Sequence, residues 1–142
     1  MKLPPDIKKK WVDALRSGEF TQGTNYLASQ IEVGPLSGRP IHHPAKGEVT
    51  KATPMCCLGV LQFILDGDVE RSVAGQSLPL PSAEWATQKG IEHVGTLNTF
   101  NSPSWCPHVK LPDFEAADPL FYVNDTAGLS FAKIADVIEE QL

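Results

Sequence analysis

Hydrophobic residues recur at helical spacing near both ends of the chain. The stretch from Ile7 to Leu15 keeps its apolar residues on one face, Pro5 can open a helix there, and Gly18 ends it. The same spacing runs from Phe131 to Leu142 behind Ser130, a residue type that caps helices. The pattern therefore predicts a first and a last helix that each bury one face.

A third apolar stretch lies in the middle of the chain and is hydrophobic on almost all sides. It runs from about Met55 to Leu65, after Pro54, and Asp66-Gly67-Asp68 ends it. A helix without a polar face is typical of the buried centre of a domain. Its longest apolar run is too short to cross a bilayer, so we expect no membrane insertion.

Other segments carry weaker signals. Residues 34–54 are rich in glycine, proline and polar residues, which predicts one long loop. The β-branched and aromatic residues of 120–123 predict a strand, and 124–128 predict the turn that follows it. Residues 91–97 give scattered strand signals.

A shorter helix is expected around Trp85, from a cap at Ser82 to Gly90. Together these elements predict an α+β fold in a single domain over residues 1–142. Helices surround the central helix at about 55–65, beside a small sheet and long loops rich in proline and glycine. Such loops on a rigid frame are where binding sites are usually built.

Composition narrows the function classes. The formal net charge is −5 and the pI is near 5.3, which argues against a polymeric nucleic acid as partner, because such binding neutralises phosphates with a basic face. Three cysteines cannot form a complete disulfide framework, and residues 1–30 do not read as a signal peptide. We expect a protein of the cytoplasm that needs no cofactor.

Cys56 and Cys57 are adjacent thiols, and a helix that begins after Pro54 places Cys56 or Cys57 in its first turn. There the unpaired N–H groups and the helix dipole favour the thiolate, which is how reactive cysteines are often activated. The other interpretation is a buried pair, since free cysteine packs as a small hydrophobic residue. The sequence leaves both interpretations open.

A reactive thiol needs a base, and the available histidines are His42, His43, His93 and His108. A Cys-dependent hydrolase would use Cys56 or Cys57 with a base such as His108, which Asn124 or Asp125 could orient.

A zinc site is a second chemical alternative. Its ligands would be Cys56, Cys57, Cys106 and His108. The spacing argues against it, because adjacent residues of a helix point in different directions, so we predict no metal.

Three sequence blocks resemble, in the same order, a family of small proteins encoded by phages and prophages. The blocks run from Lys10 to Gly23, from Cys56 to Leu61 and from Asn124 to Asp136. Family members often carry an aromatic residue before the two thiols, where this chain has Met55, and a further thiol in the following helix, where it has Gln62-Phe63. The resemblance implies a phage accessory protein in the cytoplasm of a bacterial host, and it brings no particular activity with it.

Small acidic phage proteins commonly act against host defence, and one strategy is to sequester nucleotide immune signals such as cyclic oligonucleotides or ADP-ribose derivatives. A ligand of that kind needs aromatic faces, amide or hydroxyl groups, and cations for its phosphates. The candidate ligand-binding residues are Arg16, Gln22, Asn25, Tyr26, Trp105, Asn124 and Asp125.

Three hypotheses follow for the function. The first is a protein that binds and sequesters a nucleotide signal without turning it over. The second is a Cys-dependent hydrolase that cleaves such a signal. The third is an inhibitor that binds a host defence enzyme through an exposed loop. For the first, a homo-oligomer is expected, because a small domain encloses a ligand more easily with a symmetric partner.

Overall fold

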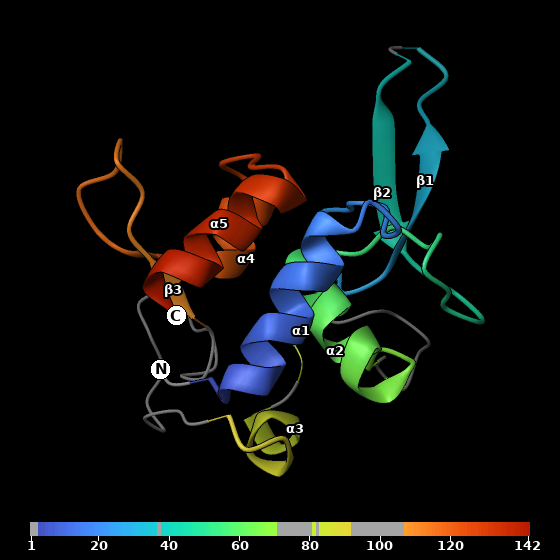
Figure 1. Ribbon diagram of the computed structural model, residues 1–142. Coiled ribbons are helices and arrows are strands. Elements are labelled where there is room, and N and C mark those ends of the chain that lie inside the picture. Colours follow the sequence, from blue (N-terminus) through green and yellow to red (C-terminus); the bar gives the residue numbers. More distant parts are fainter. Residues whose placement is uncertain (1–2, 37, 71–80, 82, 92–106) are drawn as a thin grey trace.

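The computed structural model describes residues 3–36, 38–70, 81, 83–91 and 107–142. Within these ranges the chain forms five helices and two small antiparallel sheets of two strands each (Figure 1). The predicted α+β class, with helices around a buried central helix and little sheet, is therefore confirmed.

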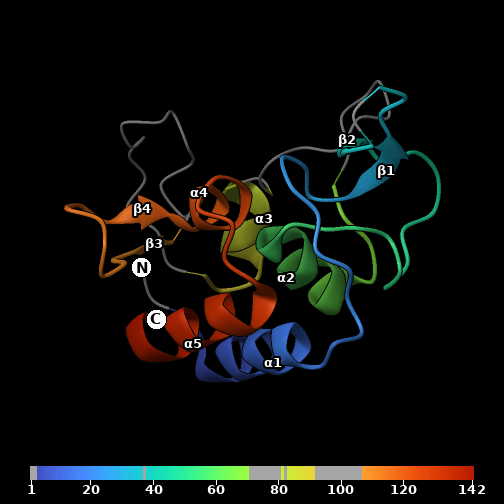
Figure 2. The ribbon, with the colours of Figure 1, turned by 90° about the horizontal axis from the view of Figure 1, so that it is seen from above.

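Helices α1 (Pro5–Arg16) and α5 (Phe131–Gln141) lie side by side on one surface of the helical body (Figures 1 and 2). Pro5 occupies the first turn of α1, where a missing N–H is not needed. The Ser130 hydroxyl accepts a hydrogen bond from the Lys133 N–H at 3.4 Å, as predicted for an N-cap. The buried faces consist of Ile7, Trp11, Val12 and Leu15 on α1, and of Phe131, Ile134, Ala135 and Ile138 on α5.

Helix α2 (Cys57–Asp66) lies in the centre of the core and contacts both α1 and α4 (Leu120–Asp125). Every residue from Cys57 to Gln62 is buried, which confirms the predicted central helix. Cys56 precedes the helix in an extended conformation, and Gly67 ends it with a left-handed φ of 77°.

One residue of α2 sets how closely the neighbouring chain can approach. Gly59 faces the backbone of Leu27, and a Cβ atom added to this glycine would lie 1.9 Å from the Leu27 carbonyl oxygen. Because no carbon and oxygen atoms can approach so closely without a bond, only glycine allows this contact. Leu27 itself is fully buried, so the segment before β1 is held tightly against α2.

The strand predicted at 120–123 is wrong, because these residues form helix α4. Pro119 begins the helix, and its buried residues Leu120, Val123 and Asn124 follow helical spacing. Burial of one helical face thus outweighs the β-propensity of the individual side chains. The predicted turn starts later than expected, since Asn124 and Asp125 still belong to α4 and Thr126 is its C-cap.

The small sheet of the helical body is built from other residues. Strand β3 (His108–Val109) pairs with β4 (Asp118–Pro119) in antiparallel register. The Leu120 N–H also donates to the Pro107 carbonyl oxygen at 2.8 Å, which carries the pairing into the start of α4.

The long loop predicted at 34–54 is also wrong, because it contains a strand. Strand β1 (Ser29–Val33) pairs with β2 (Pro40–Pro44) in an antiparallel hairpin that projects away from the helices (Figure 1). The glycine and proline signals at 34–38 mark the tip of this hairpin, where Gly38 has a φ of 67°.

The prolines of β2 do not break the hairpin, for a geometric reason. The Gly34 N–H donates to the Arg39 carbonyl oxygen at 3.0 Å, and the Ala45 N–H donates to the Ala28 carbonyl oxygen at 3.1 Å. These two hydrogen-bonded pairs lie at the two ends of the ladder. Hydrogen-bonded pairs alternate with non-bonded pairs in an antiparallel ladder. Pro40 and Pro44 therefore fall at non-bonded positions, where the missing N–H is not needed.

Helix α3 (Ala83–Gln88) is short and is fastened to the end of α2. The buried Trp85 donates its indole N–H to the Asp66 carboxylate, which also forms an ion pair with Lys89. The cap predicted at Ser82, the strand signals at 92–97, and Trp105 lie outside the described residues. Within the described ranges, no helix is long and apolar enough to cross a membrane.

Candidate functional site

The N-terminal end of α2 is where the structure brings most of the candidate residues together. Cys57 begins this helix and Cys56 is its N-cap residue. The Asn124 side chain reaches the helix start from a distant part of the chain, and Gln22 bonds to Asn124. The three blocks that carry the resemblance thus meet in space. Their contacts decide whether the place is a ligand site or part of the framework.

Asn124 is the centre of a buried hydrogen-bond network and is only 1% exposed. Its Oδ1 accepts from Gln22 Nε2 at 3.1 Å and from the Cys57 backbone N–H at 3.3 Å. Its Nδ2 donates to the Gly23 carbonyl oxygen at 2.9 Å and to Asp125 Oδ1 at 2.6 Å. A side-chain amide has two donors and two acceptor sites, so the hydrogen-bonding capacity of Asn124 is fully used.

Gln22 is committed in the same way. Its Nε2 donates to Asn124 and also to the Leu129 carbonyl oxygen at 2.7 Å, which uses both amide hydrogens. Gln22 and Asn124 therefore hold three chain segments together, and the Asn124 oxygen satisfies a helix N–H that has no partner inside α2. Within the described structure their function is to position the start of α2.

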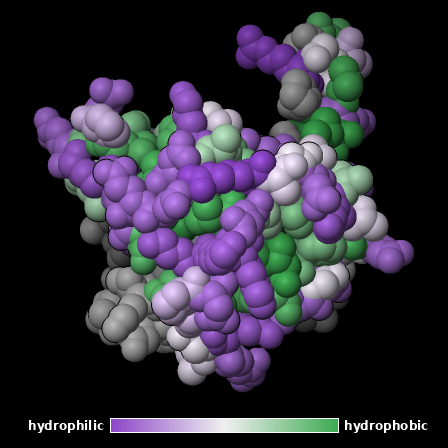
Figure 3. Space-filling view, viewed as in Figure 1, coloured by the Kyte–Doolittle hydropathy of each residue, from purple (hydrophilic) through white to green (hydrophobic). Residues whose placement is uncertain are grey.

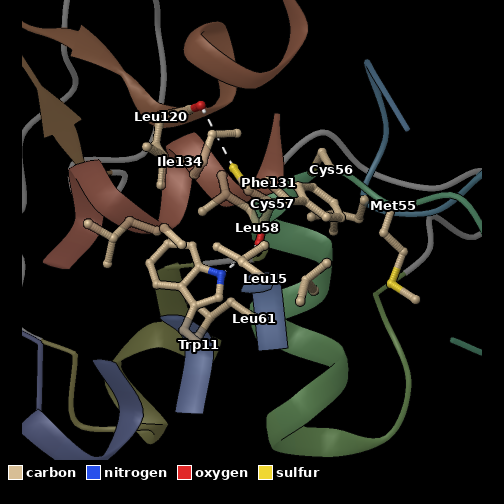
Figure 4. Packing of buried hydrophobic residues seen from close by; sticks show 14 of the residues in the cluster. Trp11, Leu15, Met55, Cys56, Cys57, Leu58, Leu61, Leu120, Phe131 and Ile134 are labelled. Atoms are coloured by element: carbon tan, nitrogen blue, oxygen red, sulfur yellow. Dashed lines mark hydrogen bonds between the residues drawn. The ribbon is translucent and has the colours of Figure 1, made fainter. Parts of the chain in front are cut away.

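Both thiols are buried, Cys56 at 1% exposure and Cys57 at 0% (Figure 4). Cys57 Sγ lies 3.8 Å from the Leu120 carbonyl oxygen, to which it donates, and the Trp11 indole N–H donates to the Cys57 carbonyl oxygen at 2.9 Å. A thiolate would be disfavoured in these apolar surroundings. Of the two interpretations left open by the sequence, the structure favours the buried pair.

His108, the alternative catalytic base, lies on β3 opposite Pro119 and is half-buried. Its strand partner therefore precedes Leu120, the residue that accepts the Cys57 hydrogen bond. His108 and Cys57 thus approach the same strand-to-helix junction, but the thiol faces the core there. The arrangement does not expose a nucleophile to a substrate.

Arg16, the candidate phosphate ligand, lies at the end of α1 beside α5. It forms ion pairs with Asp136 at 2.6 Å and with Glu139 at 2.5 Å. Hydrogen bonding to Asp136, and then to Glu139, raises the pKa of this guanidinium above its ordinary value. Arg16 therefore joins two helices at the surface and stays charged.

Asn25 and Tyr26 lie on the segment between α1 and β1. Asn25 is exposed, with a left-handed φ of 70°, and Tyr26 is half-buried. The Tyr26 carbonyl oxygen accepts from the Cys56 N–H at 3.3 Å. The structure thus places the Tyr26 backbone at the start of α2, while Asn25 makes a turn.

The residues that sequence reasoning missed are in the hairpin of β1 and β2. Four large hydrophobic residues of the described chain are exposed, and all lie between positions 31 and 41. Ile31 is 46% exposed, Val33 66% and Ile41 44%, and Leu36 is fully exposed at the tip. The alternation Gln30-Ile31-Glu32-Val33 before Gly34-Pro35 is the signal that could have found them.

The two faces of β1 differ in chemistry. Ile31 and Val33 lie on one face of β1. Gln30 and Glu32 lie on the other face, where Glu32 Oε2 is 3.2 Å from His43 Nε2 of β2. Ile41, the cross-strand partner of Glu32, lies on this second face as well. The apolar face of β1 has little contact with the remaining helices and strands, since β1 and β2 pack chiefly on each other.

The chain was compared with protein-family models, with curated proteins and with solved structures, and no match was found in any of the three. Its function is therefore inferred from its own residues.

The burial of the thiols gives a prediction that separates a framework from a nucleophile. In a Cys106→Ser background, Cys56 and Cys57 are expected to react with Ellman's reagent at least about a hundredfold more slowly in the native protein than in guanidinium chloride, because reaction requires local opening. Rapid labelling of one thiol in the native protein would contradict this and support the hydrolase.

Proposed function

We propose that this protein acts by binding another protein through the hairpin of residues 29–44. The observation that carries the proposal is the concentration of exposed large hydrophobic residues on that hairpin. Single exposed hydrophobic residues are common on protein surfaces, but a cluster on one projecting element marks an interaction site. Figure 3 shows hydrophobic surface on this projecting lobe, and hydrophobic patches also lie among the hydrophilic side chains of the helical body on the same side.

The shape of the element supports the same proposal. A β-hairpin that stands clear of its own domain can enter a groove or pair with a strand of a second protein without disturbing the core. The buried core includes one face of each of α1, α2, α4 and α5, which contact one another, and the exposed hydrophobic residues of the hairpin are not part of it. Recognition and folding are thus assigned to different parts of the chain.

The resemblance to phage-encoded proteins suggests the kind of partner. On that basis the protein is an inhibitor that binds a bacterial defence enzyme. The buried thiols support the absence of catalysis by these residues, because neither presents a nucleophile at the surface.

Sequestration of a nucleotide signal is the second candidate, and one arrangement favours it. Lys8, Lys9 and Arg16 line a hollow on the surface of α1, where they could meet phosphates. Lys9 is paired with Asp13, and Arg16 with two carboxylates, so a ligand would have to displace these partners. The hollow therefore supports nucleotide binding less than the hairpin supports protein binding.

Sequestration is tested by measuring the melting temperature with and without a cyclic dinucleotide. If the hollow binds the nucleotide, the melting temperature should rise, and this rise should be absent in Arg16→Gln.

The hairpin proposal is tested by changing its exposed side chains. The double variant Val33→Thr, Leu36→Ser keeps β-propensity in β1 and removes apolar surface from positions that the core does not use. We expect a protein captured by the tagged wild type from bacterial cells to be bound at least about tenfold more weakly by the variant, in quantitative pull-downs. The melting temperature should not change.

The matched control is Ala132→Ser, which alters exposed apolar surface on α5 instead of on the hairpin. This variant should capture the same protein as the wild type. If the hairpin variant captured the protein as well as the wild type does, the hairpin would not be the binding element. The same conclusion would follow if the control variant lost as much capture as the hairpin variant.

A further inference from the structure

We propose that the partner adds an extended segment as a third strand on the free edge of β1, and that this segment alternates hydrophobic and basic residues. The inference rests on the proposed function of the hairpin and specifies its mode of recognition and the chemistry of the partner. It is carried by the register of the hairpin, the positions of its prolines, and its charges.

The outer edge of β1 has open hydrogen-bonding groups. Gly34 forms a hydrogen-bonded pair with Arg39, and bonded and non-bonded pairs alternate along the ladder. Val33 and Ile31 therefore occupy non-bonded pairs, and their N–H and C=O groups point away from β2. No hydrogen bond joins the N–H or C=O of these two residues to another part of the chain that the structure describes. An open edge of this kind pairs readily with a strand of another chain.

The outer edge of β2 is closed by its sequence. Pro40 and Pro44 occupy two of its three outward positions and have no N–H, so only His42 can donate there. The open stretch of the β1 edge is limited at both ends. The Ser29 N–H donates to the Pro54 carbonyl oxygen at 2.7 Å, and Pro35 has no N–H. The hairpin therefore offers one edge, and on it the groups of Ile31 and Val33.

The side chains along this edge specify the pattern of the added strand. Residues placed opposite Ile31 and Val33 lie on the exposed apolar face and should be hydrophobic. The residue opposite Glu32 lies on the other face, where the Glu32 carboxylate contacts His43 but remains 71% exposed, so it can also accept from a lysine or arginine. The net charge of −5 on the whole chain favours a basic segment as well.

A second copy of this chain fits the edge poorly. A symmetric antiparallel pair that uses both Ile31 and Val33 places Glu32 directly opposite Glu32 of the second copy, and like charges at that position are destabilising. Shifting the centre of symmetry to Ile31 would use the Ser29 N–H, which is already bonded, and shifting it to Val33 would use Pro35. A different protein with the alternating pattern avoids all three conflicts.

The experiment uses the full-length protein and a short acetylated peptide that alternates valine and lysine, at physiological salt. We expect this peptide to slow hydrogen exchange of the Ile31 and Val33 amides at least about tenfold, measured by NMR, without slowing that of His42. A peptide of the same composition with its lysines in one block, and one that alternates valine and glutamate, should bind at least about tenfold more weakly.

Two proline variants at one cross-strand pair provide the matched test. Ile31 and His42 face each other in the ladder, and each has an outward N–H. Ile31→Pro blocks the open edge and should weaken peptide binding at least about tenfold, whereas His42→Pro blocks the opposite edge and should leave it unchanged. If Ile31→Pro does not fold, the amide exchange of the wild-type protein with the peptide still shows whether a strand is added at Ile31 and Val33.

The outcomes separate this inference from the proposed function. Strand addition is overturned if the peptide binds without slowing the exchange of the Ile31 and Val33 amides. It is also overturned if the two proline variants lose the same amount of peptide affinity. If Ile31→Pro still captures a cellular partner that the Val33→Thr, Leu36→Ser variant has lost, the hairpin binds proteins by another mode and only this inference fails. If no partner depends on the hairpin, the proposed function fails.

Discussion

Gly59→Ala is expected to destabilise the protein by about 3 kcal/mol or more. The added Cβ atom would lie 1.9 Å from the Leu27 carbonyl oxygen and 2.7 Å from the Leu27 carbonyl carbon. Both are backbone atoms, so no side-chain rotation can relieve the clash, and α2 must move away from the segment before β1. The gain in helix propensity of about 1 kcal/mol for alanine over glycine is too small to compensate.

Urea unfolding of the two proteins measures this difference, with equal m-values as the check on two-state behaviour. Gly18→Ala is the control, because its φ of 76° is left-handed and no atom lies within 4 Å of the added Cβ. That variant should cost only about 1 kcal/mol of conformational strain. If Gly59→Ala were no worse than Gly18→Ala, the close approach of α2 to Leu27 would be refuted.

Asn124→Ala is expected to cost about 3 to 4 kcal/mol of stability. Removing the side chain leaves the Cys57 N–H, the Gly23 carbonyl oxygen and one Gln22 hydrogen without their partner in a buried place. A buried donor or acceptor that loses its partner costs roughly 1 to 3 kcal/mol, and three such groups are affected. Denaturant unfolding measures the loss, and exchange of the Cys57 amide should become faster.

Asp125→Asn is the matched control for that prediction. It changes the neighbouring residue on α4 and retains an oxygen that can accept from Asn124 Nδ2, so a change below about 1 kcal/mol is expected. A near-native stability for Asn124→Ala would mean that water or a shifted side chain replaces the network. Asn124 would then be available to bind a ligand, which is the role that its residue type indicates in the sequence.

Local patterns explain which parts of the fold could be predicted. The faces of α1 and α5 follow from apolar spacing within short windows. The end of α2 follows from Gly67, whereas its start at Cys57 lies two residues after the predicted one at about Met55. The hairpin was missed because Pro40 and Pro44 suggest a loop until their register is known. Helix α4 was missed because its residues favour strands individually, while their burial follows helical spacing.

The candidate site could be predicted only in part, since its meaning depends on distant contacts. Asn124 bonds to Gln22 and Cys57, which are 102 and 67 positions away in the sequence. The sequence offers Gln22 and Asn124 only as separate candidates for binding a ligand, and it does not show that their side chains lie together. Whether such groups bind a ligand or one another depends on their hydrogen-bond partners, and no local pattern contains that information.

The separation of the hairpin from the core has a consequence for how such a protein can change. The hairpin joins the rest of the chain through a few backbone contacts at its base, such as that of Ser29 with Pro54. The residues between positions 30 and 43 can therefore be exchanged for another hairpin of the same register without repacking α2. One scaffold can then acquire new binding partners through substitutions that leave its stability almost unchanged.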